Sequence, residues 1–159
     1  MPIEDTISED LLTRLRTCKK TVTRWVADNR AKLRHIESTC EAISDSGDEF
    51  QIYMRQSQLV SDNFSCGIKW KSLDGEWVTL ARYNGSSHTH QNKSNGQKII
   101  NACHIHQITV EAVQQGWDHE NYATSTQRYS DLDGAKIALS ADFSISGLIP
   151  AFKQLEICN

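Results

Sequence analysis

The stretch from residue 64 to residue 83 constrains the fold more than any other part of this 159-residue chain. In FSCGIKWKS the apolar side chains fall on one face, at Phe64, Cys66, Ile68 and Trp70. This period of two is typical of a half-buried strand. LDGE follows with an Asp-Gly pair that favours a tight turn, and EWVTLARY has apolar residues on both faces. The stretch therefore predicts an antiparallel hairpin whose second strand is central in a sheet.

A second hairpin is predicted upstream, where STCEAIS and EFQIYMR flank the turn sequence DSGD. Phe50, Ile52 and Met54 alternate there with polar residues, and KIINACHIHQI predicts a later strand. Strands joined by short turns favour a meander. The expected fold class is α+β, with N-terminal helices, an antiparallel β-meander of about five or six strands, and a C-terminal helix.

Helical patterns precede and follow these strands in the sequence. Residues 8–17 predict a helix capped by Ser8, a helical pattern returns over residues 23–34, and Ser130 begins a capping-box sequence. We expect a single domain over residues 1–159. Its parts would be a basic helical N-terminal segment (1–35), an antiparallel sheet with a long loop at 84–98 (36–108) and a helical C-terminal part (109–159).

The charge is unevenly distributed along the chain. The formal net charge is −3, yet residues 11–35 contain eight Lys and Arg residues against a single acid, Asp28. Such a segment can bind a polyanion, or it can be a solvated helix face. Its candidate anion-binding residues are Lys19, Lys20, Arg24, Arg30 and His35.

Composition also limits the cellular setting. The five cysteines include no C-x-x-C pair, which argues against a disulfide framework and a cysteine-rich zinc site. No stretch approaches the ~18 apolar residues of a membrane span, and the sequence MPIEDTISED lacks the apolar run of a signal peptide. We therefore expect a soluble, cytoplasmic protein that does not associate with membranes.

The candidate site lies in LARYNGSSHTHQNKSNGQKIINACHIHQI, residues 80–108, which contains four of the six histidines. They form two H-x-H pairs, His88 with His90 and His104 with His106. Residues two apart on a strand point the same way, so His104 and His106 should project from one face. Whether the long loop brings the first pair to that face is left open by the sequence.

Clustered imidazoles suit acid–base chemistry near neutral pH. Cleavage of RNA through its 2′-hydroxyl needs a base, an acid and cations for the phosphorane. The four histidines could supply the first two, and Arg82 and Lys93 the third, with help from Asn92. Tyr83 and Trp117 could stack on bases.

Two other interpretations of the histidines remain open. His88, His90, His104 and His106 could instead bind a divalent metal such as Zn or Mn. Residues 82–108 contain no Asp or Glu, which metal sites commonly add, so we expect no cofactor. The histidines could also be packed side chains that hold the loop by hydrogen bonds.

The strings RYNGSSHTHQN and CHIHQIT, with FSCGIKW before them and NYATSTQRYSDLDGA and DFSISG after them, carry a resemblance. Over roughly residues 19–147 the chain resembles a widespread family of uncharacterised bacterial and prophage proteins with R-Y-N-G-S-S-H-x-H-x-N followed by H-I-H. It departs from that pattern at Ser144. A weaker similarity, to histidine-cluster toxins of toxin–antitoxin modules, implies a nuclease.

The leading hypothesis is a ribonuclease-like protein that cleaves or binds nucleic acid, such as a toxin or a phage-conflict effector. RNA is the favoured ligand, an antitoxin or another protein is a possible partner, and a metal-independent reaction is favoured. One alternative is a non-catalytic inhibitor or accessory protein of a mobile element that binds a protein or nucleoprotein. A second alternative is a metal-dependent enzyme with histidine ligands.

Overall fold

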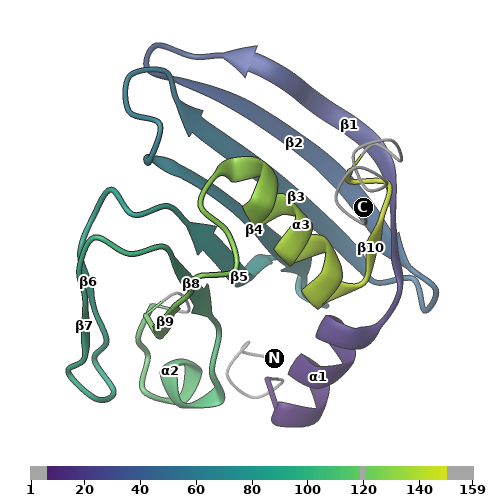
Figure 1. The fold of residues 1–159 in the computed structure, drawn as a ribbon. Helices are drawn as coiled ribbons and strands as arrows, with labels where there is room; N and C mark the ends of the chain where they lie inside the picture. Colours follow the sequence, from purple (N-terminus) through teal and green to yellow (C-terminus); the bar gives the residue numbers. More distant parts are fainter. Residues whose placement is uncertain (1–6, 119–120, 150–159) are drawn as a thin grey trace.

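The computed structural model describes residues 7–118 and 121–149, and these residues form an α+β fold with three helices and mainly antiparallel strands (Figure 1). The helices are α1 (Glu9–Thr17), α2 (Val110–Gln114) and α3 (Leu132–Phe143). The strands are β1 (Lys20–Ala31), β2 (His35–Ser44), β3 (Glu49–Ser57), β4 (Phe64–Lys71), β5 (Trp77–Asn84), β6 (His90–Gln91), β7 (Lys98–Ile99), β8 (His104–Gln107), β9 (Ala123–Ser125) and β10 (Ile145–Ser146). No helix in the described ranges has the length and apolar character needed to cross a lipid bilayer.

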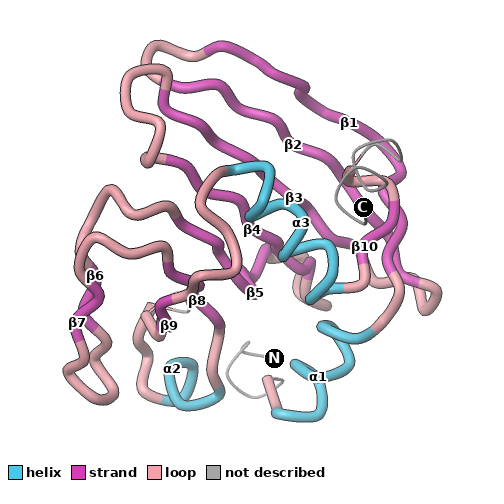
Figure 2. Tube along the Cα trace, viewed as in Figure 1, coloured by secondary structure: helices cyan, strands magenta, loops and turns pink. Residues whose placement is uncertain are grey.

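The main sheet has eight strands in the order β10-β1-β2-β3-β4-β5-β8-β9. Strands β1 to β5 are successive antiparallel neighbours, and β10 pairs with β1 in parallel. Strands β6 and β7 form a separate hairpin, which Figure 2 shows as two short strands within long loops. The predicted meander is confirmed, and the sheet is larger than the five or six strands expected.

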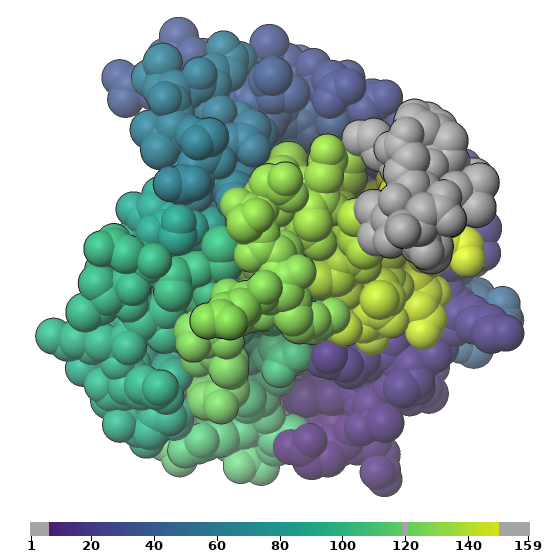
Figure 3. Space-filling view, in the orientation of Figure 1, coloured from purple at the N-terminus to yellow at the C-terminus, as the bar shows by residue number. Residues whose placement is uncertain are grey.

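Helix α3 lies across one face of this sheet and fills the centre of the molecular face seen in Figure 3. Its buried side chains Ala135, Leu139 and Phe143 belong to the main hydrophobic core. The sheet contributes cross-strand neighbours to this core, namely Phe50 with Trp70, Ile52 with Ile68, and Cys66 with Tyr83. The alternation predicted for β3 and β4 therefore places their apolar face beneath α3.

The side of the sheet opposite α3 is called the outer face. Its side chains alternate with those of the core along each strand. They are Glu37 and Thr39 on β2, Gln51, Tyr53 and Arg55 on β3, Ser65 and Lys69 on β4, Arg82 and Asn84 on β5, and His104 and His106 on β8.

A β-bulge lies within β5. Ala81 pairs with Ile68 and Thr79 pairs with Lys69, so Leu80 is an extra residue without an opposite partner on β4. Both Leu80 and Ala81 are buried, which explains the apolar character of both faces in the sequence. Beyond the bulge, Tyr83 faces the core and Arg82 faces outward.

The prediction of a helix over residues 23–34 is wrong, because these residues belong to β1 and the turn that follows it. Val26, Ala27 and Ala31 do recur at helical spacing, but the segment also contains Trp25 and the β-branched Thr23 and Val26, residue types that favour strands. Pairing with β2 along the length of β1 decides between the two structures. The described part of the N-terminal segment, residues 7–35, is therefore helical only in α1, where Ser8 Oγ accepts from the Leu11 amide at 3.1 Å as predicted.

Three boundaries also differ from the prediction. The expected strand over residues 98–108 is divided into β7 and β8 by a turn in which Asn101 has a φ of 49°. The long loop at 84–98 contains β6, which returns to pair with β7. Helix α3 is capped by Asp131, whose side chain accepts from the Gly134 amide, and not by Ser130.

Candidate metal centre

Two rows of residues cross the outer face and end in histidines. In the first row, Gly67 pairs with Arg82, which pairs with His106; in the second, Ser65 pairs with Asn84, which pairs with His104. Neighbouring strands lie about 4.8 Å apart, so paired side chains on one face are in contact. The prediction that His104 and His106 project from one face is confirmed.

The long loop brings the first histidine pair back to this face. His90 lies in β6, and its ring centroid is 4.6 Å from that of His106 and 6.0 Å from that of His104. The His88 ring lies 4.9 Å from the His104 ring. The question that the sequence left open is thus answered by the geometry: all four imidazoles form one cluster, called the histidine cluster.

Three members of the histidine cluster bring possible ligand atoms close together. One nitrogen from each of His88, His104 and His106 lies within 4.8 Å of the other two. His104 and His106 are buried, whereas His88 is exposed. These three close histidines could hold a metal ion, with His88 on the solvent side.

The tautomer of His104 is fixed by its surroundings. Its Nδ1 donates to the Ala102 carbonyl at 3.0 Å, which makes Nε2 the acceptor nitrogen of the ring. That Nε2 lies 3.4 Å from Nδ2 of Asn84, and Nε2 of His88 lies at the same distance from the same atom. A backbone carbonyl that fixes the tautomer in this way is the usual outer-shell partner of a metal-binding histidine.

His90 is held differently. Its Nε2 lies 2.6 Å from the carbonyl oxygen of Asn121 and 2.9 Å from Oδ1 of Asn92, so it must be the donor. Asn92 is itself fixed, since its side chain exchanges two hydrogen bonds with the backbone of Ala123. In neutral His90 the nitrogen able to accept a proton is therefore Nδ1.

Electrostatics lower the pKa of two members of the histidine cluster, His88 and His104. Burial lowers the pKa of His88, and the charges of Arg82 and His90 lower it further. Burial also lowers the pKa of His104, with Arg82, His88 and His90 acting in the same direction, against the Ala102 hydrogen bond. Neutral imidazole is the form that binds metals and accepts protons.

A buried oxygen of Asn84, beside the histidine cluster, lacks a hydrogen-bond partner among the described residues. Asn84 is 2% exposed, and its Oδ1 has no such partner. A buried acceptor of this kind is costly unless a ligand or water satisfies it. Asn84 was not among the residues predicted for the site, although the period-two rule that groups His104 with His106 also groups Asn84 with Arg82.

Several predicted binding residues have structural roles instead, which corrects those predictions. Tyr83 is fully buried and donates to Asp142, so its ring cannot stack on a base. Lys20 is fully buried against backbone carbonyls. The amide of Asn92 is occupied by Ala123 and His90.

The other predicted anion-binding residues lie outside the histidine cluster. Lys19, Arg24 and Arg30 are exposed near β1, which four strands separate from β8. Arg24 pairs with Glu41 at 3.0 Å. Lys93 is exposed after β6, and His35 begins β2 beside Arg55.

Comparison with known proteins adds no further assignment. No protein-family model, curated protein or solved structure matches the chain.

Proposed function

We propose that this protein is a metal-dependent hydrolase of phosphate esters, with a Zn²⁺-type centre held by His88, His104 and His106. The convergence of three imidazole nitrogens within 4.8 Å of one another supports this most directly. Tetrahedral zinc with Zn–N bonds of about 2.0–2.1 Å needs nitrogens about 3.3 Å apart, which small ring rotations would reach. Three histidines with an open fourth position suffice for a catalytic zinc site, so a carboxylate ligand is not required.

The surroundings favour an anionic substrate. Arg82 lies on β5 and is the cross-strand neighbour of His106 on β8. Its guanidinium is suited to bind a phosphoryl group at this position. A bound metal would polarise a phosphoryl oxygen and acidify water. In the hydrolysis, water adds to phosphorus, the bond from phosphorus to the leaving oxygen breaks, and the proton of water passes to that oxygen. His90 Nδ1 is suited to take up that proton in transit.

Metal binding by the purified chain tests this proposal. After chelation and dialysis against Zn²⁺, elemental analysis should find one metal per chain, and the metal should raise the melting temperature. His88→Ala should lose the metal yet keep its circular dichroism spectrum, because His88 is exposed. His35→Ala, on the same face but outside the histidine cluster, should keep the metal. A wild-type chain that binds no transition metal, or a His88→Ala variant that binds as tightly, would overturn the proposal.

A metal-independent ribonuclease is the second candidate, because four imidazoles lie in one cluster and could supply both a general base and a general acid. The pKa of His88 and of His104 is lowered, which favours the neutral form that a base needs. RNA cleavage in EDTA that leaves 2′,3′-cyclic phosphate ends would identify this mechanism. Hydrolysis of a phosphodiester such as bis(p-nitrophenyl) phosphate that stops with EDTA and returns with Zn²⁺ would identify the metal-dependent one.

A further inference from the structure

We infer that a groove on the outer face binds single-stranded RNA and leads it to the histidine cluster, an inference that rests on the proposed function for the reaction site. The groove, called the outer groove, consists of two adjoining cavities of about 470 and 400 Å³ that share Arg55 and Ser65. One cavity begins at Arg34 and His35, and the other ends at Arg82.

The strand register connects the outer groove to the histidine cluster. Arg55 pairs with Ser65, Ser65 with Asn84, and Asn84 with His104. Three strand spacings of about 4.8 Å thus separate Arg55 from His104, or about 14 Å. A chain lying in the outer groove would pass Arg82 and reach the histidine cluster without leaving the sheet surface.

The charge of the outer groove suits a polyanion. Its lining includes Arg34, Arg55, Lys69 and Arg82, on a chain whose net charge is −3. Among the described residues Glu37 is the one carboxylate that lines it, and Glu37 already lies 3.4 Å from Lys32 Nζ and from His35 Nε2. Cations that follow a line across an exposed face are the electrostatic footprint of nucleic-acid backbone binding.

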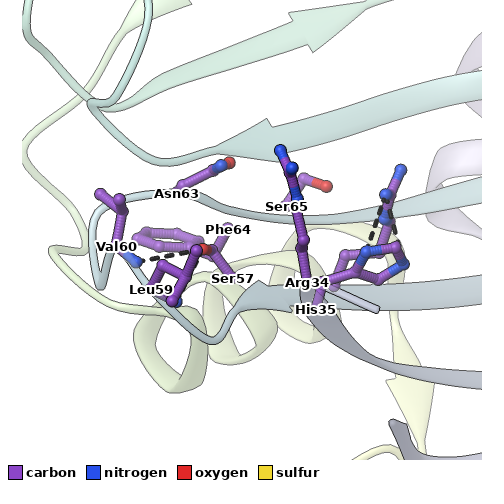
Figure 4. A pocket seen from close by; sticks show the side chains of 9 residues that line it. Arg34, His35, Ser57, Leu59, Val60, Asn63, Phe64 and Ser65 are labelled. Atoms are coloured by element: carbon purple, nitrogen blue, oxygen red, sulfur yellow. Dashed lines mark hydrogen bonds between the residues drawn. The ribbon is translucent and has the colours of Figure 1, made fainter. Parts of the chain in front are cut away.

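The outer groove also offers surfaces on which unpaired bases can stack. The hydroxyl end of the Tyr53 ring lies against Gly67, where an added Cβ would come within 2.7 Å of the ring, and the Lys69 ammonium lies 5.6 Å from the ring centroid. Aromatic rings lying on a sheet bind single-stranded bases in this way. At the other end, Figure 4 shows Leu59, Val60 and Phe64 on the side of the cavity away from Arg34 and His35. Leu59 is 79% exposed, which provides apolar contact for a second base.

Polar side chains between the cations favour RNA over DNA. Thr39, Gln51 and Ser65 line the outer groove with hydroxyl and amide groups. Such groups can donate to and accept from the ribose 2′-hydroxyl, which DNA lacks. A base can stack on Tyr53 only when its faces are free of neighbouring base pairs, so the occupant that fits best is a single strand.

The test measures fluorescence anisotropy of a labelled, mixed-sequence single-stranded RNA bound to the full chain in EDTA, where metal-dependent cleavage is absent. Arg55→Glu should weaken binding at least tenfold and reduce the slope of log K against log salt by about 1, as loss of one phosphate contact requires. Arg24→Glu is the matched control, since it makes the same charge change on an exposed residue near the far edge of the sheet. It should change the affinity less than twofold.

The same assay is repeated with single-stranded DNA of the same sequence, with duplex RNA and with a polyglutamate peptide. Equal binding of the same sequence as DNA, stronger binding of duplex RNA or of a polyglutamate peptide, or equal effects of the two variants would overturn the inference. Zinc content of Arg55→Glu, measured in parallel, should match wild type. If the chain binds zinc but not RNA, only the inference about the outer groove is contradicted. If the chain binds RNA but not zinc, only the proposed metal centre is contradicted.

Discussion

Lys20 shows how a charged residue can be part of the core. Its side chain is fully buried, and its ammonium donates to the carbonyls of Phe143 at 2.6 Å and Cys18 at 2.9 Å, with Arg16 at 3.4 Å. These carbonyls lie at the C-terminal ends of α1 and α3, where the helix dipoles favour a cation. Burial lowers the pKa of Lys20 even so, against the opposing influence of Cys18 and Asp48.

Replacement of this ammonium should cost substantial stability. Lys20→Met is expected to lower the free energy of unfolding by about 2–4 kcal/mol, because it leaves buried carbonyls without donors. Lys19→Met changes an exposed neighbour and should stay within about 0.5 kcal/mol of wild type. Urea denaturation followed by tryptophan fluorescence compares the two variants, and equal midpoints would contradict the proposed role of Lys20.

At the scale of elements, the start of the long loop depends on close backbone packing. Gly85 follows β5, its amide donates to the Phe64 carbonyl at 3.0 Å, and a Cβ at this position would overlap the carbonyl oxygen of Asp62. Because a backbone atom cannot rotate away, the chain would have to shift. His88 comes three residues later, so the geometry of the histidine cluster depends on this contact.

Gly85→Ala should therefore affect both stability and the site. The free energy of unfolding should fall by about 1–3 kcal/mol from overpacking, and Zn²⁺ affinity should fall with it. Ser87→Ala, at an exposed position of the same loop, is the control and should match wild type in both measurements. Thermal unfolding and zinc titration of Gly85→Ala that are indistinguishable from wild type would show that the loop accommodates the methyl group.

The elements were predictable wherever one local signal dominated. The alternation in β3 and β4, the Asp-Gly turn and the Ser8 cap are all present in the structure. Strand β1 was not predictable, because its apolar residues fit both periods and only pairing with β2, a contact distant in sequence, selects the strand. Helix propensity is a weak prior that tertiary contacts override.

The site was predictable only in part for a similar reason. The period-two rule brought His104 and His106 together, but the approach of His88 and His90 depends on the β6–β7 hairpin and on Asn121, which is 31 residues from His90. The basic residues near the N-terminus are a stronger signal in the sequence than Arg55 and Lys69. Those two reach the outer groove because of strand register, which local composition does not reveal.

At the scale of the whole molecule, one carboxylate joins segments that are distant in sequence. Asp142 on α3 accepts two hydrogen bonds from Arg128, at 2.9 and 2.8 Å, and one from Tyr83 on β5. It also lies 3.9 Å from Arg16 on α1. Burial raises the pKa of Asp142, but the hydrogen bonds from Arg128 and Tyr83 and the nearby arginine charges outweigh it, so the net pKa is lowered.

This lowered pKa gives stability a defined pH dependence. A carboxyl whose folded pKa is below its unfolded value of about 3.9 stabilises the fold at higher pH, and this contribution is lost as the pH falls through the folded pKa. Asp142→Asn should be about 1–3 kcal/mol less stable than wild type at pH 7, and the difference should shrink below about pH 4.

Urea unfolding of both proteins at pH 7, 5 and 3 checks this expectation. The control is Asp133→Asn, since that carboxylate is 62% exposed and its ion pair with Lys136 is long, at 3.8 Å. It should lie within about 0.5 kcal/mol of wild type throughout. A difference between Asp142→Asn and wild type that stays constant down to pH 3 would mean that shape, and not charge, accounts for the effect.

The bulge in β5 has a consequence for insertions and deletions. In a regular strand, losing or gaining one residue turns every later side chain to the opposite face. Strand β5 already contains one residue more than its partner β4 between Thr79 and Ala81. A deletion of one residue at the bulge would therefore keep Arg82 and Asn84 on the outer face. Straightening the strand at its present length would instead turn both inward and expose Tyr83, removing the outer groove and the histidine cluster together.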